Sequence, residues 1–243
     1  MTLRHQQLIA SLKRATTFSL LSLDSLDRLA GGTTEIEFRR GNVVFSRGTS
    51  PTGIHVAASG QLKLTLDTRH GVEHVVELVP QCASFGEAAL LSNRPHLVTA
   101  IAVTDCKVLH IGRRTVIAEL ERDKEFTRRM IGALSDRLYR QTSEMENVLF
   151  LKATGRVARF ILDCLTAMGA ENGRCVTLPA KKGLIASQLN MTQEHFSRTL
   201  RELTTSGLIK VNGTIVDVIE FEKLRDMAGL MVAPGYAEAS GRI

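Results

Sequence analysis

The sequence predicts an α+β protein in which a β-rich module, a long central helix and a winged helix-turn-helix follow one another. Three observations support this fold class. Short β-branched runs separated by glycines, from about Thr34 to Ile111, are typical of a compact sandwich or roll. The stretch that follows contains no proline and carries apolar residues at helical spacing. The last third alternates helical patterns with an Asn-Gly pair between β-branched runs, which is a strong hairpin signal.

Length and composition are those of an ordinary globular protein. The 243 residues give room for two domains, with 44% hydrophobic and 23% charged residues. A net charge of +6 suits a polyanionic partner without identifying one. The opening MTLRHQQLIASLKRA lacks the apolar core of a signal peptide, and no apolar run is long enough to span a bilayer. We therefore expect a cytoplasmic protein without a membrane partner.

The cysteines lie far apart in the sequence. Cys82, Cys106, Cys164 and Cys175 form no C-x-x-C pair. This pattern favours reduced thiols, as in a cytoplasm, over a disulfide framework. It also does not suit a thiolate metal cluster, which needs ligand pairs close together in the sequence.

The N-terminal module is expected over residues 1–112. Residues 1–31 are predicted to form short helices, because LSLDSLDRLA is amphipathic. The stretch TRHGVEH is predicted to be a hairpin tip, with Gly71 able to take a positive φ. Strands are predicted at the runs NVVF, QLKLTL, EHVVELV, AIAV and CKVLHI.

A long helix is expected over residues 113–151, because Thr115–Phe150 contains neither proline nor another strong break. Its apolar residues alternate spacings of three and four, with Gln141 filling one position, and such a narrow stripe is typical of a helix–helix seam. The stripe could pack on its own β module. Its length, after a complete β module, favours a symmetric dimer. The predicted dimer contacts are Ile131, Leu134, Leu138, Met145 and Val148.

A third region, residues 152–228, carries the pattern of a winged helix-turn-helix. GRVARFILDCLTAM is predicted to be a helix and CVTLP a short strand. KKGLIASQLN and MTQEHFSRTLREL are predicted to be two helices joined by a tight turn, and GLIKV and TIVDVIE a hairpin closed at Asn212-Gly213. Residues 229–243 are predicted to be a poorly ordered tail.

The second helix of this motif places three polar side chains on one face. Glu194, Ser197 and Arg198 are three and four residues apart, so they point the same way. A solvated, salt-bridged face is the alternative, because glutamate and arginine four residues apart form a favourable pair. In a helix-turn-helix the second helix presents its N-terminal turns to the major groove. There Arg198 suits guanine, Glu194 suits cytosine or adenine, and Ser197 suits either kind of edge.

Neighbouring residues are expected to support this helix. Thr192 is a predicted N-cap, and Asn190 suits a left-handed turn before it. Ala186 is small where the two helices approach, while Phe196 and Leu200 are expected to pack onto the first helix. Contacts to DNA phosphates are expected from Lys181, Lys182, Thr192, Arg201, Lys210 and Asn212.

These segments together resemble the CRP/FNR family of bacterial transcription regulators. The resemblance rests on LPAKKGLIASQLNMTQEHFSRTLRELTTSGLIKVNGTIVDV, on SGQLKL and FGEAALL in the β-rich module, and on the long helix between them. It covers about residues 15–228. The resemblance implies a cyclic-nucleotide-binding-like β-roll as sensor, a dimerisation helix, and a homodimer that binds a two-fold symmetric promoter site and contacts RNA polymerase. It implies a regulator rather than an enzyme.

The recognition helix resembles that of the FNR-like branch of the family. This branch carries E-x-x-S-R, matched here by Glu194, Ser197 and Arg198, whereas the CRP-like branch has glycine at the serine position. The resemblance implies the half-site TTGAT, arranged as the palindrome TTGAT-N4-ATCAA.

The resemblance also implies an effector pocket at Phe85, Gly86, Glu87 and His96. The stretch that would hold a phosphate-binding arginine reads PHLVTA, and an apolar residue cannot neutralise a buried phosphate. Cyclic AMP is therefore the alternative effector rather than the expected one. An iron–sulfur cluster is not expected either, because residues 1–81 contain no cysteine.

The histidines leave a further effector open. His55, His70, His74, His96 and His110 all fall in the β-rich module. The lack of both a cysteine cluster and the phosphate-binding arginine resembles the DNR/NnrR-type branch, which responds to nitric oxide through haem. His55 and His96 are the candidate haem ligands, whereas His70 and His74 flank a hairpin tip and are expected to be solvated. A cupin-like metal enzyme fits less well, because the chain has no H-x-H pair.

Overall fold

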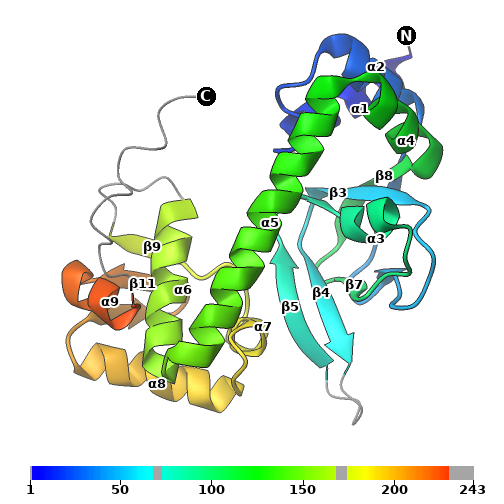
Figure 1. Cartoon of the computed structure of the whole chain (residues 1–243). Coiled ribbons are helices and arrows are strands. Elements are labelled where there is room, and N and C mark those ends of the chain that lie inside the picture. The colour runs from blue at the N-terminus through cyan, green and yellow to red at the C-terminus, as the bar shows by residue number, and fades with distance from the viewer. Residues whose placement is uncertain (1, 68–72, 168–173, 230–243) are drawn as a thin grey trace. The chain divides into compact units, whose positions relative to one another are not determined.

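The structure is a computed structural model that describes residues 2–67, 73–167 and 174–229 (Figure 1). The chain divides into two compact units, Met1–Gln141 and Thr142–Ile243. None of the helices in the described ranges is long and apolar enough to cross a membrane. The predicted hairpin tip with His70 and Gly71, and all of the predicted tail except Gly229, lie outside the described residues.

The first unit begins with two short helices, as predicted. They are α1 (Leu3–Arg14) and α2 (Leu23–Gly31), and each starts at a side-chain cap. The Thr2 hydroxyl accepts from the backbone N–H of His5, and the Ser22 hydroxyl from that of Ser25. Their apolar faces enter a core that also contains residues of the β-roll; its members include Leu12, Phe18, Leu26, Leu29, Ile54, Leu109 and Ile111.

Two antiparallel sheets form the β-roll in the described residues, with strand orders β1-β8-β3-β6 and β2-β7-β4-β5. Apolar side chains from both sheets meet in one core, so the predicted roll is confirmed. The helix α3 (Glu87–Ser92) lies between β6 and β7 in the chain. The strands are β1 (Thr33–Phe38), β2 (Val43–Phe45), β3 (Gly53–Ser59), β4 (Leu62–Asp67), β5 (Glu73–Val79), β6 (Ser84–Phe85), β7 (Thr99–Ala102) and β8 (Cys106–Gly112).

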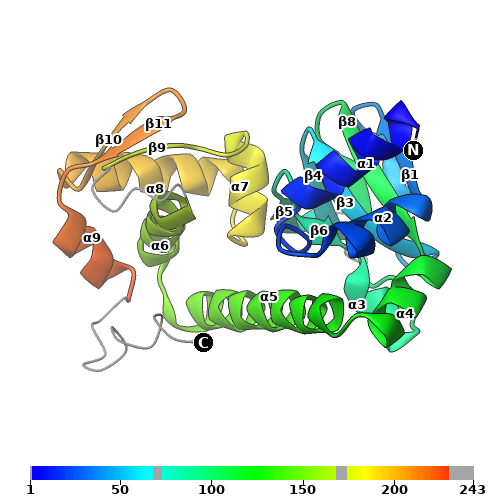
Figure 2. The same ribbon diagram turned by 90° about the horizontal axis from the view of Figure 1, so that it is seen from above.

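The central stretch forms two helices, so the predicted single helix over 113–151 is wrong. These are α4 (Arg113–Arg122) and α5 (Lys124–Phe150), separated at Asp123, whose φ of −113° and ψ of 108° are extended. The Asp123 carboxylate accepts from the backbone N–H groups of Glu125 at 2.8 Å and Phe126 at 3.2 Å. Asp123 therefore caps α5 and ends α4, although the sequence has no glycine or proline there. From this cap α5 continues without a break to Phe150 (Figure 2).

The predicted apolar stripe of α5 faces outward in the single chain. Ile131 is 60% exposed and Leu138 is 66% exposed. Met145 and Val148 are also exposed, while Leu134 is half-buried. Only at the start of the helix do apolar side chains enter the core of the first unit, through Phe126 and Met130. Ile131 and Leu138 therefore do not pack on the β module of their own chain, which was the alternative to a dimer seam.

The second unit has the predicted order of elements around one core. Val157, Ile161, Leu162 and Leu165 of the first helix face inward, as predicted. Its short sheet has the strand order β10-β11-β9. A final helix, which the sequence patterns did not predict, buries Leu224 in the same core. The elements are α6 (Ala153–Ala167), β9 (Cys175–Thr177), α7 (Lys182–Gln188), α8 (Gln193–Thr205), β10 (Ile209–Asn212), β11 (Ile215–Val218) and α9 (Phe221–Met227).

The wing is the hairpin of β10 and β11, and its turn differs from the predicted one by a residue. Asn212 pairs with Ile215, so the turn consists of Gly213 and Thr214, and Asn212 is the last strand residue. Gly213 has a φ of +63°. Glycine at the first turn position is what a type II′ hairpin requires. The predicted hairpin is therefore confirmed, with Asn212 outside its turn.

Candidate nucleic-acid interface and effector region

The turn between α7 and α8 has the predicted local structure. Asn190 is left-handed, with a φ of +55°. The Thr192 hydroxyl accepts from the backbone N–H of His195 at 3.2 Å and thereby caps α8. Ala186 is buried where the two helices meet. Three short-range signals in the sequence thus fix how α8 begins.

Packing fixes which face of α8 is exposed. Phe196, Leu200 and Leu203 are buried in the core of the second unit, which also contains Ile185 of α7. Thr199, on the same side, is buried and donates to the carbonyl oxygen of His195. Because these residues face inward, the opposite side of α8 faces solvent.

That solvent-facing side carries the three predicted base-contacting residues. Glu194 and Arg198 are exposed, and Ser197 is half-buried. Within the part of the chain that the structure describes, Glu194 and Arg198 form no ion pair with each other or with another residue. The alternative of a salt-bridged face therefore has no support in the geometry. A shallow hollow continues this face along the helix, lined by Arg198, Arg201, Glu202, Thr205 and Ser206.

The predicted phosphate-contacting residues lie on or next to α7, α8 and the wing of the same unit. Lys181 directly precedes α7 and Lys182 begins it. Lys210 and Asn212 lie on β10 of the wing, and both are exposed. The Thr192 oxygen accepts a hydrogen bond from the backbone N–H of His195, and its hydroxyl hydrogen remains available as a donor.

In the first unit, the candidate haem ligands His55 and His96 lie in a cluster of aromatic rings. The rings of Phe45 and His96 stack, with centroids 3.8 Å apart. His55 lies 5.2 Å from Phe85 and 5.0 Å from His110, again between centroids. On the strands, His55 pairs with Phe85 of β6 and with His110 of β8. His110 was not predicted to join this cluster; its place there follows from the pairing register of β3 and β8.

Gly86 lies against these rings and has a φ of +90°. A Cβ at this position would be 3.3 Å from Nδ1 of His55 and 3.7 Å from Cε1 of His96. Both the left-handed backbone and the nearby rings therefore favour glycine. The structure thus brings together Phe85, Gly86, His96 and His55 from the predicted pocket and ligand sets.

Glu87, the remaining predicted pocket residue, is paired with Arg137 of α5. The Glu87 carboxylate lies 3.6 Å from Nη1 of Arg137, whose Nη2 donates to Glu77 at 2.5 Å. Burial raises the pKa of Glu87, and the positive charge of Arg137 opposes that shift. Arg137 was not predicted as a pocket residue, because an arginine on the polar side of a helix gives no local sign of a partner 50 residues away in the chain.

His55 is the most perturbed histidine of the ring cluster. Burial, together with the neighbouring His110 and His96, lowers its pKa to about 3. Its Nδ1 is buried without a hydrogen-bond partner. His55 is therefore neutral at pH 7, with a ring nitrogen not engaged by the protein. Among the described residues, no group of three His, Cys, Asp or Glu side chains is placed to hold a metal ion.

Comparison with known proteins identifies the family. Residues 35–123 match the family model of the cyclic nucleotide-binding domain, and residues 155–227 match that of the Crp-like helix-turn-helix domain. The solved structure of a Silicibacter pomeroyi protein, described as a cAMP-binding regulatory protein, is 30% identical, with a TM-score of 0.57. That match covers 92% of this chain and 99% of the other. This chain belongs to the CRP/FNR family of transcription regulators.

Further known proteins match over most of their length. A CRP-like cAMP-activated global transcriptional regulator from Mycobacterium tuberculosis is 22% identical, over 88% of this chain and 96% of the relative. FixK2 from Bradyrhizobium japonicum is 19% identical, with a TM-score of 0.70, over 80% of this chain and 96% of that one. At this identity the FixK2 match bears on the fold alone. As a CRP/FNR-type protein, the chain is a DNA-binding transcription regulator and not an enzyme.

Proposed function

We propose that this CRP/FNR regulator acts as a homodimer on the palindrome TTGAT-N4-ATCAA, contacts RNA polymerase, and responds to an effector at the β-roll. One observation supports the proposal that α8 contacts the bases of this DNA site. Glu194, Ser197 and Arg198 share the solvent-facing side of α8, and Glu194 and Arg198 have no ion-pair partner in the described residues.

The chemistry of these side chains suits base edges. Arg198 has a planar fork of donors that matches O6 and N7 of guanine. Glu194 can accept from the amino group of cytosine or adenine, and Ser197 can donate or accept. Phosphate contacts from Lys181, Lys182, Thr192, Arg201, Lys210 and Asn212 would then set affinity and orientation without sequence information.

A palindromic site calls for a two-fold symmetric protein, and α5 supplies the surface for it. The seam residues of α5 recur at the spacing that two helices need to interdigitate. Ile131, Leu138 and Met145 are each at least 60% exposed in the single chain. Apolar side chains in such a row favour burial against a second copy of the same helix.

Binding to the palindrome tests this proposal directly. We expect the protein to bind TTGAT-N4-ATCAA at least about 1,000-fold more tightly than a scrambled duplex of equal length, because specific sites of such proteins exceed nonspecific DNA by that order or more. Fluorescence anisotropy at one fixed salt concentration measures both affinities. A third duplex, with one half-site scrambled, tests whether both halves are read. Equal affinity for the intact and scrambled duplexes would contradict the proposed site.

The effector is proposed to be nitric oxide sensed through haem, as in the DNR/NnrR-type branch. Support comes from His55, whose neutral imidazole and unengaged Nδ1 suit coordination of haem iron. His96 is the second candidate ligand. Both histidines are less than 10% exposed, so a macrocycle can bind them only if the rings packed around them move apart. Bound haem would supply an iron centre that takes up the gas.

A spectrum of the protein tests the haem proposal. Protein expressed with ample haem is expected to show a Soret band that shifts with nitric oxide, and His55→Ala or His96→Ala should lose it. His110→Ala is the matched control from the same cluster. Full haem content in the His55→Ala/His96→Ala double variant would exclude these ligands, and no haem uptake by the wild type would exclude haem. Cyclic AMP bound tightly by haem-free protein would instead support the alternative effector.

A further inference from the structure

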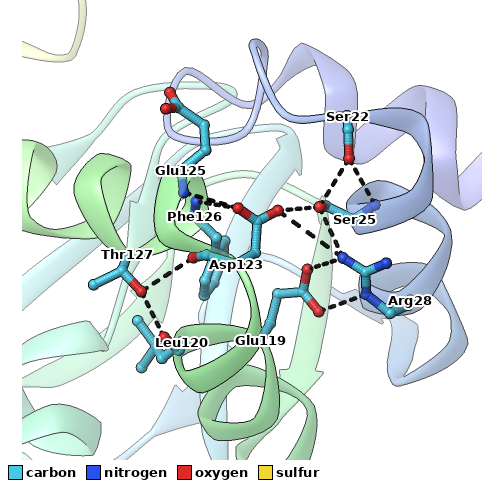
Figure 3. A network of polar contacts seen from close by, with 9 residues as sticks. All are labelled: Ser22, Ser25, Arg28, Glu119, Leu120, Asp123, Glu125, Phe126 and Thr127. Atoms are coloured by element: carbon cyan, nitrogen blue, oxygen red, sulfur yellow. Dashed lines mark hydrogen bonds and ion pairs between the residues drawn. The ribbon is translucent and has the colours of Figure 1, made fainter.

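A partly buried polar network ties α2 to the corner between α4 and α5 (Figure 3). On the side of α2 it contains Ser22, Ser25 and Arg28, and at the corner it contains Glu119 and Asp123. The network lies within the first unit and apart from the ring cluster. It lies at the start of α5.

Arg28 and Glu119 form the central ion pair of the network. Nε of Arg28 donates to one Glu119 oxygen at 2.8 Å, and Nη2 donates to the other at 2.6 Å. The Glu119 side chain is only 3% exposed. Two parallel hydrogen bonds fix both the distance and the orientation of the two groups. The pair therefore holds α2 and α4 in one relative arrangement.

Ser25 and Asp123 extend the network to α5. The Ser25 hydroxyl is fully buried; it accepts from Nη2 of Arg28 at 3.0 Å and donates to Oδ2 of Asp123. The other oxygen of Asp123 accepts from the backbone N–H groups of Glu125 and Phe126 in the first turn of α5. One carboxylate thus connects α2 to the N-terminus of α5, as the dashed lines of Figure 3 show.

Apolar packing secures the same turn of α5. Phe126 is fully buried and stacks on Phe18, with ring centroids 5.9 Å apart. Thr127 donates to the carbonyl oxygen of Leu120 at 2.6 Å, which ties the first turn of α5 to the last turn of α4. From Ile131 onward the apolar residues of the stripe are mostly exposed. The first turn of α5 is therefore held by the network and by apolar packing, and Arg137 adds a second attachment further along the helix, to Glu77 and Glu87.

We infer that the network of Ser25, Arg28, Glu119 and Asp123 is a positioning device for α5. It fixes the direction in which the helix leaves the first unit, and through the dimer seam it fixes the half-site spacing that the dimer accepts. The second part rests on the proposed homodimer. A buried ion pair often adds little to stability compared with apolar residues, yet can select one arrangement among several. The pair is thus expected to matter for geometry more than for stability.

Replacing the ion pair by apolar residues of similar size separates these two roles. The double variant Arg28→Met/Glu119→Leu should keep the thermal unfolding midpoint, because apolar contacts replace the buried charge of Glu119 and its half-buried partner Arg28. Spin labels at Glu37 and Arg140, both exposed and both in the first unit, report the direction of α5 in a cysteine-free background. In dimers formed with an excess of unlabelled chains, so that most labelled chains have an unlabelled partner, the wild type is expected to give one narrow distance peak by pulsed electron resonance, and the double variant to lose it.

DNA binding by the same variants gives the second readout. The wild type should prefer the TTGAT palindrome over one whose spacer is longer by one base pair, and in the double variant the ratio of the two affinities should fall toward one. A folded double variant that keeps both the narrow distance peak and the wild-type ratio of the two affinities would overturn the inference. If that variant fails to fold, Arg28→Lys, which keeps the charge but loses the two-pronged contact, decides by the same two readouts. The label distances are measured without DNA, so they test the role of the network even if the wild type does not bind the palindrome.

Discussion

Replacing Leu138 with glutamate is expected to convert the dimer to a monomer and to weaken binding to the palindrome about 100- to 10,000-fold. Two copies of the variant would bring like charges together in a seam that excludes water, where an unpaired charge is strongly unfavourable. A monomer can hold only one half-site at a time, so it loses the gain from simultaneous binding to both. Analytical ultracentrifugation measures the oligomeric state, and anisotropy measures the affinity.

Tyr139→Glu is the matched control for this change. Tyr139 is the next residue of α5, is 79% exposed, and lies off the stripe. The control variant introduces the same charge on the same turn, so it should remain dimeric and keep its affinity. A Leu138→Glu variant that stays a tight dimer would remove the stripe from the proposed interface.

Loss of Arg198 is expected to relax the choice of base at one position of each half-site. Arg198→Ala should cost about 1–3 kcal/mol of binding free energy on the TTGAT palindrome and less on duplexes changed at the guanine. Arg201→Ala, one turn further along α8, is the matched control, because a lost phosphate contact should weaken all sequences alike and lower the salt slope by about one. Affinities of both variants for a panel of single-base changes, over a salt series, separate the two outcomes.

Ser197→Gly tests the same face more sharply, because it removes one hydroxyl and leaves Glu194 and Arg198 in place. The substitution gives this position the glycine found in the CRP-like branch. The preferred half-site is therefore expected to shift from TTGAT toward TGTGA. Glycine inside the helix should lower stability by about 1 kcal/mol, which unfolding experiments measure separately. If both Ser197→Gly and Arg198→Ala leave base preference unchanged, α8 does not read the bases as proposed.

Local patterns predicted the second unit well. The cap at Thr192, the left-handed Asn190 and the buried Phe196 each depend on residues close in the sequence, so short motifs carry the information. The wing shows the limit of such motifs. Asn-Gly predicted the hairpin, but the strand pairing of Asn212 with Ile215 set which residues turn.

The first unit was predicted less completely, since long-range contacts decide much of it. β3 was missed because its first five residues are all buried, so it lacks the alternation that marks a half-exposed strand. The end of α4 depends on Asp123, whose partners Ser25 and Arg28 come from α2. The pair of Arg28 and Glu119 joins residues 91 positions apart. No window of sequence contains both members of such a contact.

The boundary between the two compact units lies after Gln141, inside the unbroken helix α5. Domain boundaries more often fall in exposed, irregular linkers, which are the segments that proteases cut first. Here every peptide bond near the boundary belongs to a hydrogen-bonded helix, so limited proteolysis will not release the two units there. A recombinant fragment that ends at Gln141 would expose about four unsatisfied carbonyl groups at a helix end that evolved without a cap. Studies of either unit alone must therefore supply a new helix terminus along with the new chain end.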